Sequence, residues 1–153
     1  MLAAGDAITL TNWWQDILDR PADLGSANLT EARLVVALRI AIFAHKSGAD
    51  PAPHVAARLG SAAISNQLSL VLEAMGQAWP EPFSVSRPCC PRLTPDESMF
   101  VGMVRSAMRG NRAAFDHQTR EMLSEDARTL IYNLMWQMGR MVISGAMSQI
   151  RDH

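Results

Sequence analysis

Apolar residues recur along most of the chain at intervals of three and four positions, which is the spacing of one face of an α-helix. This spacing predicts helices over residues 9–19, 30–47, 51–59, 61–79, 95–109, 112–123 and 125–150. Residues 80–93 contain four prolines and are predicted to form a structured linker. The prediction is therefore an all-α fold, a compact bundle of six or seven helices in one domain spanning residues 1–153, with no internal repeat.

The last predicted helix carries a narrow polar stripe and is apolar over most of its remaining surface. The stripe consists of Asn133, Gln137, Arg140 and Ser144. A helix of this kind is surrounded by other helices or by a partner. Methionine is concentrated in the C-terminal third of the chain, and flexible thioethers suit either an irregular core or an adaptable binding surface. A filled core is one interpretation, and our preferred elaboration is a homodimer with an interaction surface made of Met135, Met138, Met141 and Val142.

The composition is that of a folded globular protein whose charge does not favour nucleic acid. Of the 153 residues, 48% are hydrophobic and 19% are charged, and the formal net charge is −1. The N-terminus lacks the basic segment of a secretory signal. The most apolar run, residues 34–44, is too short to span a bilayer and is interrupted by Arg39. We therefore expect a cytoplasmic protein without membrane contact.

The candidate chemistry lies in the segment from Pro88 to Glu97, PCCPRLTPDE. Its two cysteines, Cys89 and Cys90, directly precede a predicted helix that Thr94 and Glu97 would open with a capping box. A disulfide between sequence neighbours is strained, because their Cα atoms lie about 3.8 Å apart and unstrained disulfides need about 4.4–6.8 Å. The spacing does not match a zinc site, so we expect no metal and no cofactor. Two interpretations remain open, thiols that pack a corner and a thiol-based redox or metal sensor centred on Cys89 and Cys90.

The same segment carries a resemblance to a known group. Leu59-Gly60, then Leu68 to Met75, then Pro88 to Glu97 resembles, in this order, a group of small uncharacterised bacterial proteins, a domain of unknown function with a CCPRxT cysteine element between two helical halves. The resemblance covers about residues 55–105. It implies a shared all-helical fold and no catalytic activity. Members often have three adjacent cysteines, whereas this chain has Pro88 before Cys89, so a role that needs a third thiol is not implied.

A second alternative is a helix-turn-helix DNA-binding regulator formed by residues 54–72. Gly60 would end its first helix, and the residues from Ser65 to Gln67 would face the bases. The turn is shorter than in that motif, and residues 59–86 contain no lysine or arginine for phosphate contacts, so we do not expect a nucleic-acid partner. No catalytic motif is recognisable. The leading hypothesis is a non-enzymatic helical interaction or regulatory module, and an enzyme is the least supported class of function.

Overall fold

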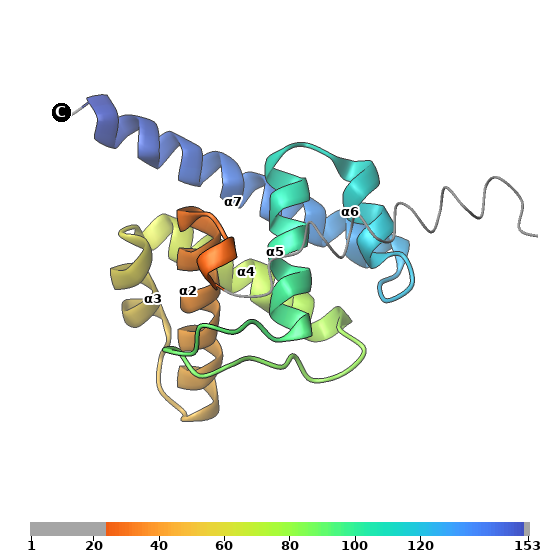
Figure 1. Cartoon of the computed structure of the whole chain (residues 1–153), viewed down its shortest axis with the longest axis horizontal. Helices are drawn as coiled ribbons and strands as arrows, with labels where there is room; N and C mark the ends of the chain where they lie inside the picture. The colour runs from red at the N-terminus through yellow and green to blue at the C-terminus, as the bar shows by residue number, and fades with distance from the viewer. Residues whose placement is uncertain (1–23, 152–153) are drawn as a thin grey trace, which may run out of the picture.

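The computed structural model describes residues 24–151, and within this range it has six α-helices and one 3₁₀ turn (Figure 1). In chain order these are η1 (Leu24–Ser26), α2 (Leu29–Lys46), α3 (Ala52–Leu59), α4 (Ala62–Ala78), α5 (Pro95–Met108), α6 (Arg112–Thr119) and α7 (Glu125–Arg151). The described range contains no β-strand, so the predicted all-α fold is confirmed. The helix expected over residues 9–19 lies outside the described residues.

Side-chain caps fix where several helices begin. Thr94 and Glu97 form the predicted capping box of α5: the Glu97 N–H donates to Thr94 Oγ1 at 3.0 Å, and the Thr94 N–H donates to Glu97 Oε1 at 2.9 Å. Ser61 caps α4 by accepting a hydrogen bond from the Ile64 N–H at 3.2 Å. These starts follow from local sequence, because each cap satisfies backbone donors that the first helical turn leaves unpaired.

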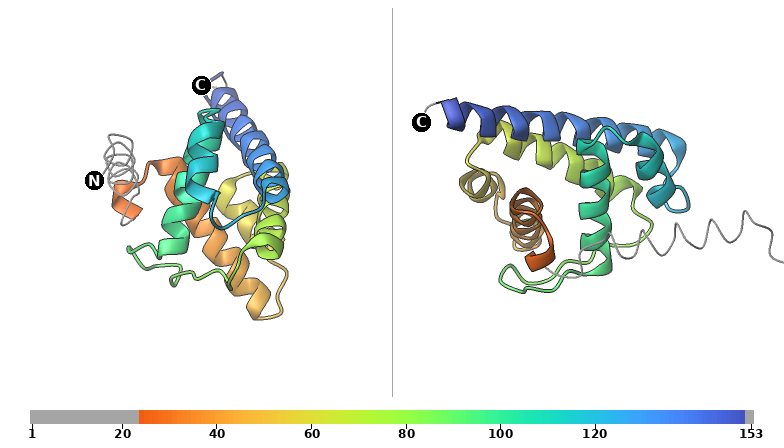
Figure 2. Two further views of the ribbon diagram at one scale, coloured as in Figure 1. Left: turned by 90° about the vertical axis from the view of Figure 1, so that its right-hand side faces the viewer. Right: turned by 45° about the horizontal axis from the view of Figure 1, so that its top comes forward.

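The bundle has two layers, one made of α4 and α7 and the other of α2, α3 and α5. Figure 2 shows α4 and α7 side by side and running in opposite directions. Across this contact the Gln67 side-chain amide donates to the Leu134 carbonyl oxygen at 3.0 Å. On the other side α3 packs along α2, α2 contacts α5, and α6 packs against α5. Because α5 also contacts α7, it joins the two layers.

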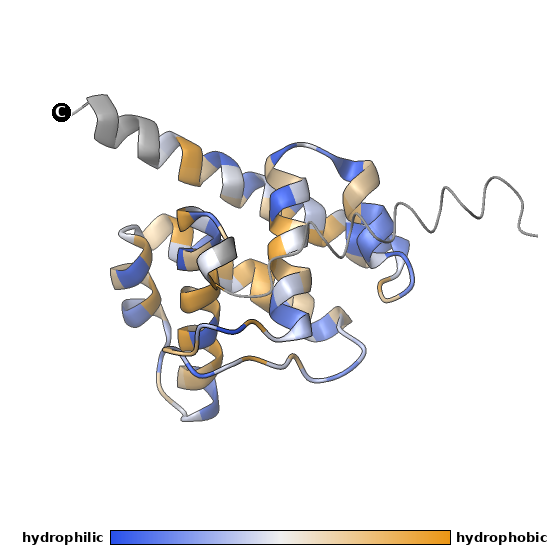
Figure 3. Cartoon of the chain, in the orientation of Figure 1, coloured by the Kyte–Doolittle hydropathy of each residue, from blue (hydrophilic) through white to orange (hydrophobic). Residues whose placement is uncertain are grey.

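The apolar core fills the space between these layers. Figure 3 shows hydrophobic residues where α2, α4 and α5 face one another and hydrophilic residues along the outer side of α3 and α6. Every α-helix contributes buried apolar side chains, among them Leu38 of α2, Val55 of α3, Leu68 of α4, Phe100 of α5, Phe115 of α6 and Ile131 of α7. Within residues 24–151, none of the helices combines the length and apolar character needed to cross a membrane.

The helices form two successive groups of the same design, a long helix, an eight-residue helix and a second long helix. The first group is α2 to α4 and the second is α5 to α7. Residues 79–94, which include the two cysteines, connect them. The cysteine segment therefore lies at the junction between two helical halves.

α2 and α5 also share a sequence pattern, a capping residue followed by a glutamate three positions later and an arginine eight positions after that. In α2 these are Asn28, Glu31 and Arg39, and in α5 they are Thr94, Glu97 and Arg105, at one offset (97 − 31 = 66 and 105 − 39 = 66). The buried apolar positions keep this offset: Leu34 and Phe100, Val35 and Val101, Ala37 and Met103, Leu38 and Val104, Ala41 and Ala107. The two stretches thus share a pattern of burial and charge, although few of their residues are identical. The capping box of Asn28 and Glu31 also makes α2 begin at Leu29, whereas the helix was expected to begin at Thr30.

Each glutamate of this pattern pairs with the arginine of the other helix. Arg39 Nε lies 2.6 Å from Glu97 Oε2, and Arg105 Nε lies 2.8 Å from Glu31 Oε2. α2 and α5 run in opposite directions where they pass each other (Figure 1). The exchange of partners therefore places one ion pair on each side of the middle of the α2–α5 contact.

Candidate functional site

The two cysteines lie on a tight turn before α5. The Cys90 N–H donates to the Arg87 carbonyl oxygen at 3.0 Å, which closes a turn with Pro88 in its second position. Cys89 is exposed and Cys90 is half-buried, and both are free thiols. The structure thus brings the two sequence-predicted thiol residues to the surface, with Cys89 the more accessible.

Arg39 of α2 holds this turn from inside the protein. Its side chain is fully buried, and all five of its N–H donors have an acceptor. Nη1 donates to the carbonyl oxygen of Cys90 at 2.7 Å and, at a long 3.5 Å, to that of Pro88. Nη2 donates to the carbonyl oxygen of Arg92 at 2.8 Å. We call this arrangement the Arg39 clamp. It binds the backbone of the cysteine segment and leaves the thiols out of the network.

The remaining donors of the clamp meet the carboxylate of Glu97. This side chain is also fully buried, and it accepts from Arg39 Nε at 2.6 Å and from Arg39 Nη2 at 3.1 Å. The same carboxylate accepts from the Thr94 N–H of the capping box and, at 3.4 Å, from the Ser86 N–H. One buried charge pair therefore joins α2, the cysteine turn and the start of α5.

Sequence reasoning missed the role of Arg39, although a signal was present. Arg39 interrupts the most apolar run of the chain, and a charged residue on the buried face of a helix requires a partner. The partners could not be named, because Cys90 and Glu97 lie 51 and 58 residues away in the chain.

The surroundings of the cysteines do not assemble a metal site. Within residues 24–151 no three or more histidine, cysteine, aspartate or glutamate side chains are grouped so that they could hold a metal ion. Two thiols alone fall short of the four ligands that a structural zinc ion takes.

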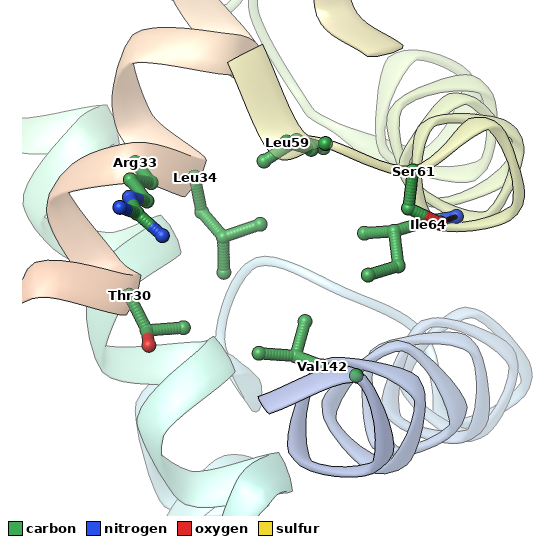
Figure 4. A pocket seen from close by; sticks show the side chains of 9 residues that line it. Thr30, Arg33, Leu34, Leu59, Ser61, Ile64 and Val142 are labelled. Atoms are coloured by element: carbon green, nitrogen blue, oxygen red, sulfur yellow. Dashed lines mark hydrogen bonds between the residues drawn. The ribbon is translucent and has the colours of Figure 1, made fainter. Parts of the chain in front are cut away.

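A pocket opens where the first turns of α2, the α3–α4 turn and α7 meet. It is partly open to solvent, has a volume of about 140 Å³, and its wall includes Leu34, Leu59, Ile64 and Val142. Figure 4 shows these apolar side chains directed toward one space from different elements, with Thr30 and Arg33 along one edge. No local sequence signal marks this pocket, because its wall comes from three distant parts of the chain.

The predicted interaction surface on the last helix needs a correction. Met135 and Met138 have no exposed surface and belong to the core, so they cannot meet a partner in this fold. Met141 and Val142 are half-buried and pack against that core. The predicted polar stripe does face outward: Asn133, Gln137, Arg140 and Ser144 are all exposed. The methionines therefore fill space between α7 and its neighbours, as the alternative interpretation held.

Two of the three residues that would read DNA bases in a helix-turn-helix are held by contacts within the protein, whereas the third, Asn66, is exposed. Ser65 is buried, and its hydroxyl donates to the Ala52 carbonyl oxygen at 3.5 Å. Gln67 is held by the Leu134 carbonyl oxygen and by Gln137 on α7. Because these contacts occupy two of the three proposed reading positions, α4 does not present a recognition face.

These features define a class, an all-α bundle of two successive helix groups whose connecting cysteine segment is clamped by a buried arginine. Comparison with protein-family models, with curated proteins and with solved structures finds no match to this chain.

Proposed function

We propose that this protein is a cytoplasmic, non-enzymatic helical interaction module that binds a second copy of itself through the outer face of α7. The observation that carries the proposal is a row of residues with coiled-coil spacing on that face. Trp136, Arg140 and Ile143 lie four and three positions apart and are all exposed. The sequence continues this spacing at Met147 and Ile150. We call the row the α7 seam.

The shape of the bundle supports pairing at this seam. α7 has 27 residues and its neighbour α4 has 17, which correspond to about 40 Å and about 26 Å of helix. Figure 1 shows the C-terminal end of α7 extending past the other helices. α7 is longer than its partner α4 and has apolar residues at intervals of three and four. Such a helix gains stability by burying these residues against another helix.

The side chains of the seam suit a specific contact. Trp136 and Ile143 are 43% and 41% exposed, although each is large and apolar. The Arg140 guanidinium lies 5.5 Å from the centre of the Trp136 ring, so the cation covers part of this aromatic surface. A single polar residue between apolar ones is a device that fixes register in coiled coils, and Arg140 has that position here.

Sedimentation velocity or native mass spectrometry over a range of concentrations tests the proposal. The unchanged chain is expected at twice its mass of 16.8 kDa, and Ile143→Asp is expected at the single mass. Leu130→Asp is the matched control, because Leu130 lies on the same helix and is 52% exposed but stands outside the seam. A monomer at every concentration, or a dimer that Leu130→Asp disrupts as readily as Ile143→Asp, would overturn the proposal.

A second candidate function, a thiol-based redox switch at Cys89 and Cys90, is favoured by the Arg39 clamp. With a peroxide as oxidant, the two thiols would lose two electrons and two protons to form one disulfide, and the peroxide would be reduced to water. Closing that ring twists the peptide between the cysteines, because neighbouring Cα atoms are closer than a relaxed disulfide allows. Arg39 binds the carbonyl oxygens of the two flanking peptides, that of Cys90 at 2.7 Å and that of Pro88 at 3.5 Å, so the twist would be transmitted to α2.

Peroxide treatment followed by thermal unfolding tests this switch. Oxidised protein is expected to unfold at a lower temperature than reduced protein, and Cys89→Ser/Cys90→Ser is expected to show no such difference. The double variant itself should unfold like the reduced chain, since the clamp holds carbonyl oxygens and not thiols. Equal unfolding temperatures for the oxidised and reduced chain, with mass spectrometry confirming the disulfide, would rule out the switch.

A further inference from the structure

The pocket beside α7 combines an apolar interior with positive charge at its edge. Leu34 and Ile64 are almost completely buried at its wall, and Leu59 and Val142 complete the apolar lining (Figure 4). The pocket is partly open to solvent and has about 140 Å³, which is close to the volume of closed apolar cavities of about 150 Å³ that hold a benzene-sized molecule in other proteins. Its size therefore fits an apolar group of about six to eight heavy atoms.

The charge at the edge of the pocket has no counterpart within the described part of the chain. Arg33 is exposed, and no hydrogen bond or ion pair to residues 24–151 engages its guanidinium. Arg33 also borders a neighbouring hollow between α2 and α3, where Arg58 is the second cation. Neither hollow is lined by an aspartate or a glutamate among the described residues. The edge is thus complementary to an anion.

We propose that this pocket binds a small monocarboxylate with a compact apolar body. The apolar body occupies the space between Leu34, Ile64 and Val142, and the carboxylate meets Arg33 at the edge. A guanidinium matches a carboxylate in geometry, since it presents two parallel N–H donors to the two oxygens. Thr30, one turn before Arg33 at the same edge, supplies a hydroxyl donor. The proposal does not depend on self-association.

Titration of the ¹⁵N-labelled full chain with benzoate, followed by nuclear magnetic resonance, tests the site. Benzoate at millimolar concentration is expected to shift the amide signals of Gly60, Ser61 and Val142, which line the pocket. Arg33→Gln should weaken benzoate about threefold to tenfold, as expected for losing one charged contact near solvent. Benzyl alcohol, which has the same ring and no charge, should bind Arg33→Gln and the unchanged chain equally.

Three further variants separate the site from its surroundings. Arg58→Gln removes a charge from the neighbouring hollow only and should leave benzoate affinity within about twofold, because interactions of exposed charges are screened by salt. Val142→Phe fills the pocket and should abolish binding of both probes, with circular dichroism confirming that the helices remain. The Ile143→Asp variant should bind benzoate like the unchanged chain, which keeps this result separate from dimerisation.

Three outcomes would overturn the inference. The first is an absence of shifts around the pocket at millimolar benzoate. The second is equal affinity for benzoate and benzyl alcohol in the unchanged chain, which would mean that Arg33 does not engage the carboxylate. The third is an equal loss of benzoate affinity in Arg33→Gln and Arg58→Gln, which would mean that general positive charge and not this pocket attracts the anion.

Discussion

Replacing Arg39 with methionine is expected to lower the free energy of unfolding by about 3–5 kcal/mol. Methionine occupies much of the same apolar space, but it leaves the fully buried Glu97 carboxylate without a counter-charge. Removing one partner of a buried ion pair has a cost of this size, because the remaining charge stays in a medium of low polarity. The carbonyl oxygens of Cys90 and Arg92 lose their donor as well. Much of that segment is exposed, so water replaces part of what they lose.

A double variant separates the ion pair from the rest of the clamp. Where a buried ion pair makes no other hydrogen bonds, replacing both partners with apolar residues often leaves the stability of the fold unchanged or raises it. In Arg39→Met/Glu97→Met the Cys90 and Arg92 carbonyl oxygens and the Thr94 N–H still lack partners. We therefore expect a residual loss of about 2 kcal/mol, smaller than that of either single replacement.

Urea unfolding followed by far-ultraviolet circular dichroism measures these values. Arg112→Met is the control, because the ion pair of Arg112 with Asp116 on α6 is partly exposed and its hydrogen bond to Thr129 of α7 is exposed. Its loss is expected to stay below about 1 kcal/mol. A loss below about 1 kcal/mol for Arg39→Met, or a double variant as stable as the unchanged chain, would refute the reasoning that the clamp organises the cysteine segment.

Two further perturbations test other parts of the bundle. Burial by itself raises the pKa of Glu31, but hydrogen bonds from Arg105 and from a backbone N–H outweigh it and leave the pKa below its ordinary value of 4.5. A lowered pKa stabilises the fold above pH 4.5, and this stabilisation is lost as the pH falls through the folded-state pKa. The stability advantage over Glu31→Gln should therefore shrink as the pH falls from about 6 to below 4.5. An advantage that is constant over this range in urea unfolding contradicts the assignment. Gly139→Ala should destabilise by about 1–3 kcal/mol, because its Cβ would lie 2.7 Å from Met108 Cγ. Gly76→Ala meets nothing within 4 Å on α4 and should stabilise by about 0.5–1 kcal/mol, and the same sign for both glycines in thermal or urea unfolding would be inconsistent with this packing.

The helices themselves could be placed from the sequence because their signals are local. Thr94 and Glu97 form the capping box as predicted, since each of its bonds spans only three residues. The first described helix shows the limit of this reasoning. Threonine is an acceptable capping residue, yet Asn28 and not Thr30 caps α2. The reason is that Asn28 and Glu31 each donate a backbone N–H to the side chain of the other.

The candidate sites were predictable only in part. The cysteine segment stood out by composition, but its backbone is bound by a residue of α2 that the chain brings close only on folding. The pocket could not be predicted from a local sequence pattern, because Leu34, Ile64 and Val142 belong to three helices.

α7 shows most clearly what the sequence by itself determined and what it left to the tertiary structure. The sequence alone predicts apolar residues on several faces of this helix and one exposed polar stripe, because the helical period assigns each side chain to a face. It does not say which apolar face is buried, since Met138 and Ile143 are equally suited to a core or a contact surface. Packing against α4 and α5 decides this by burying Met135 and Met138 and leaving Trp136 and Ile143 exposed. That choice depends on contacts between residues far apart in the chain, which no local pattern encodes.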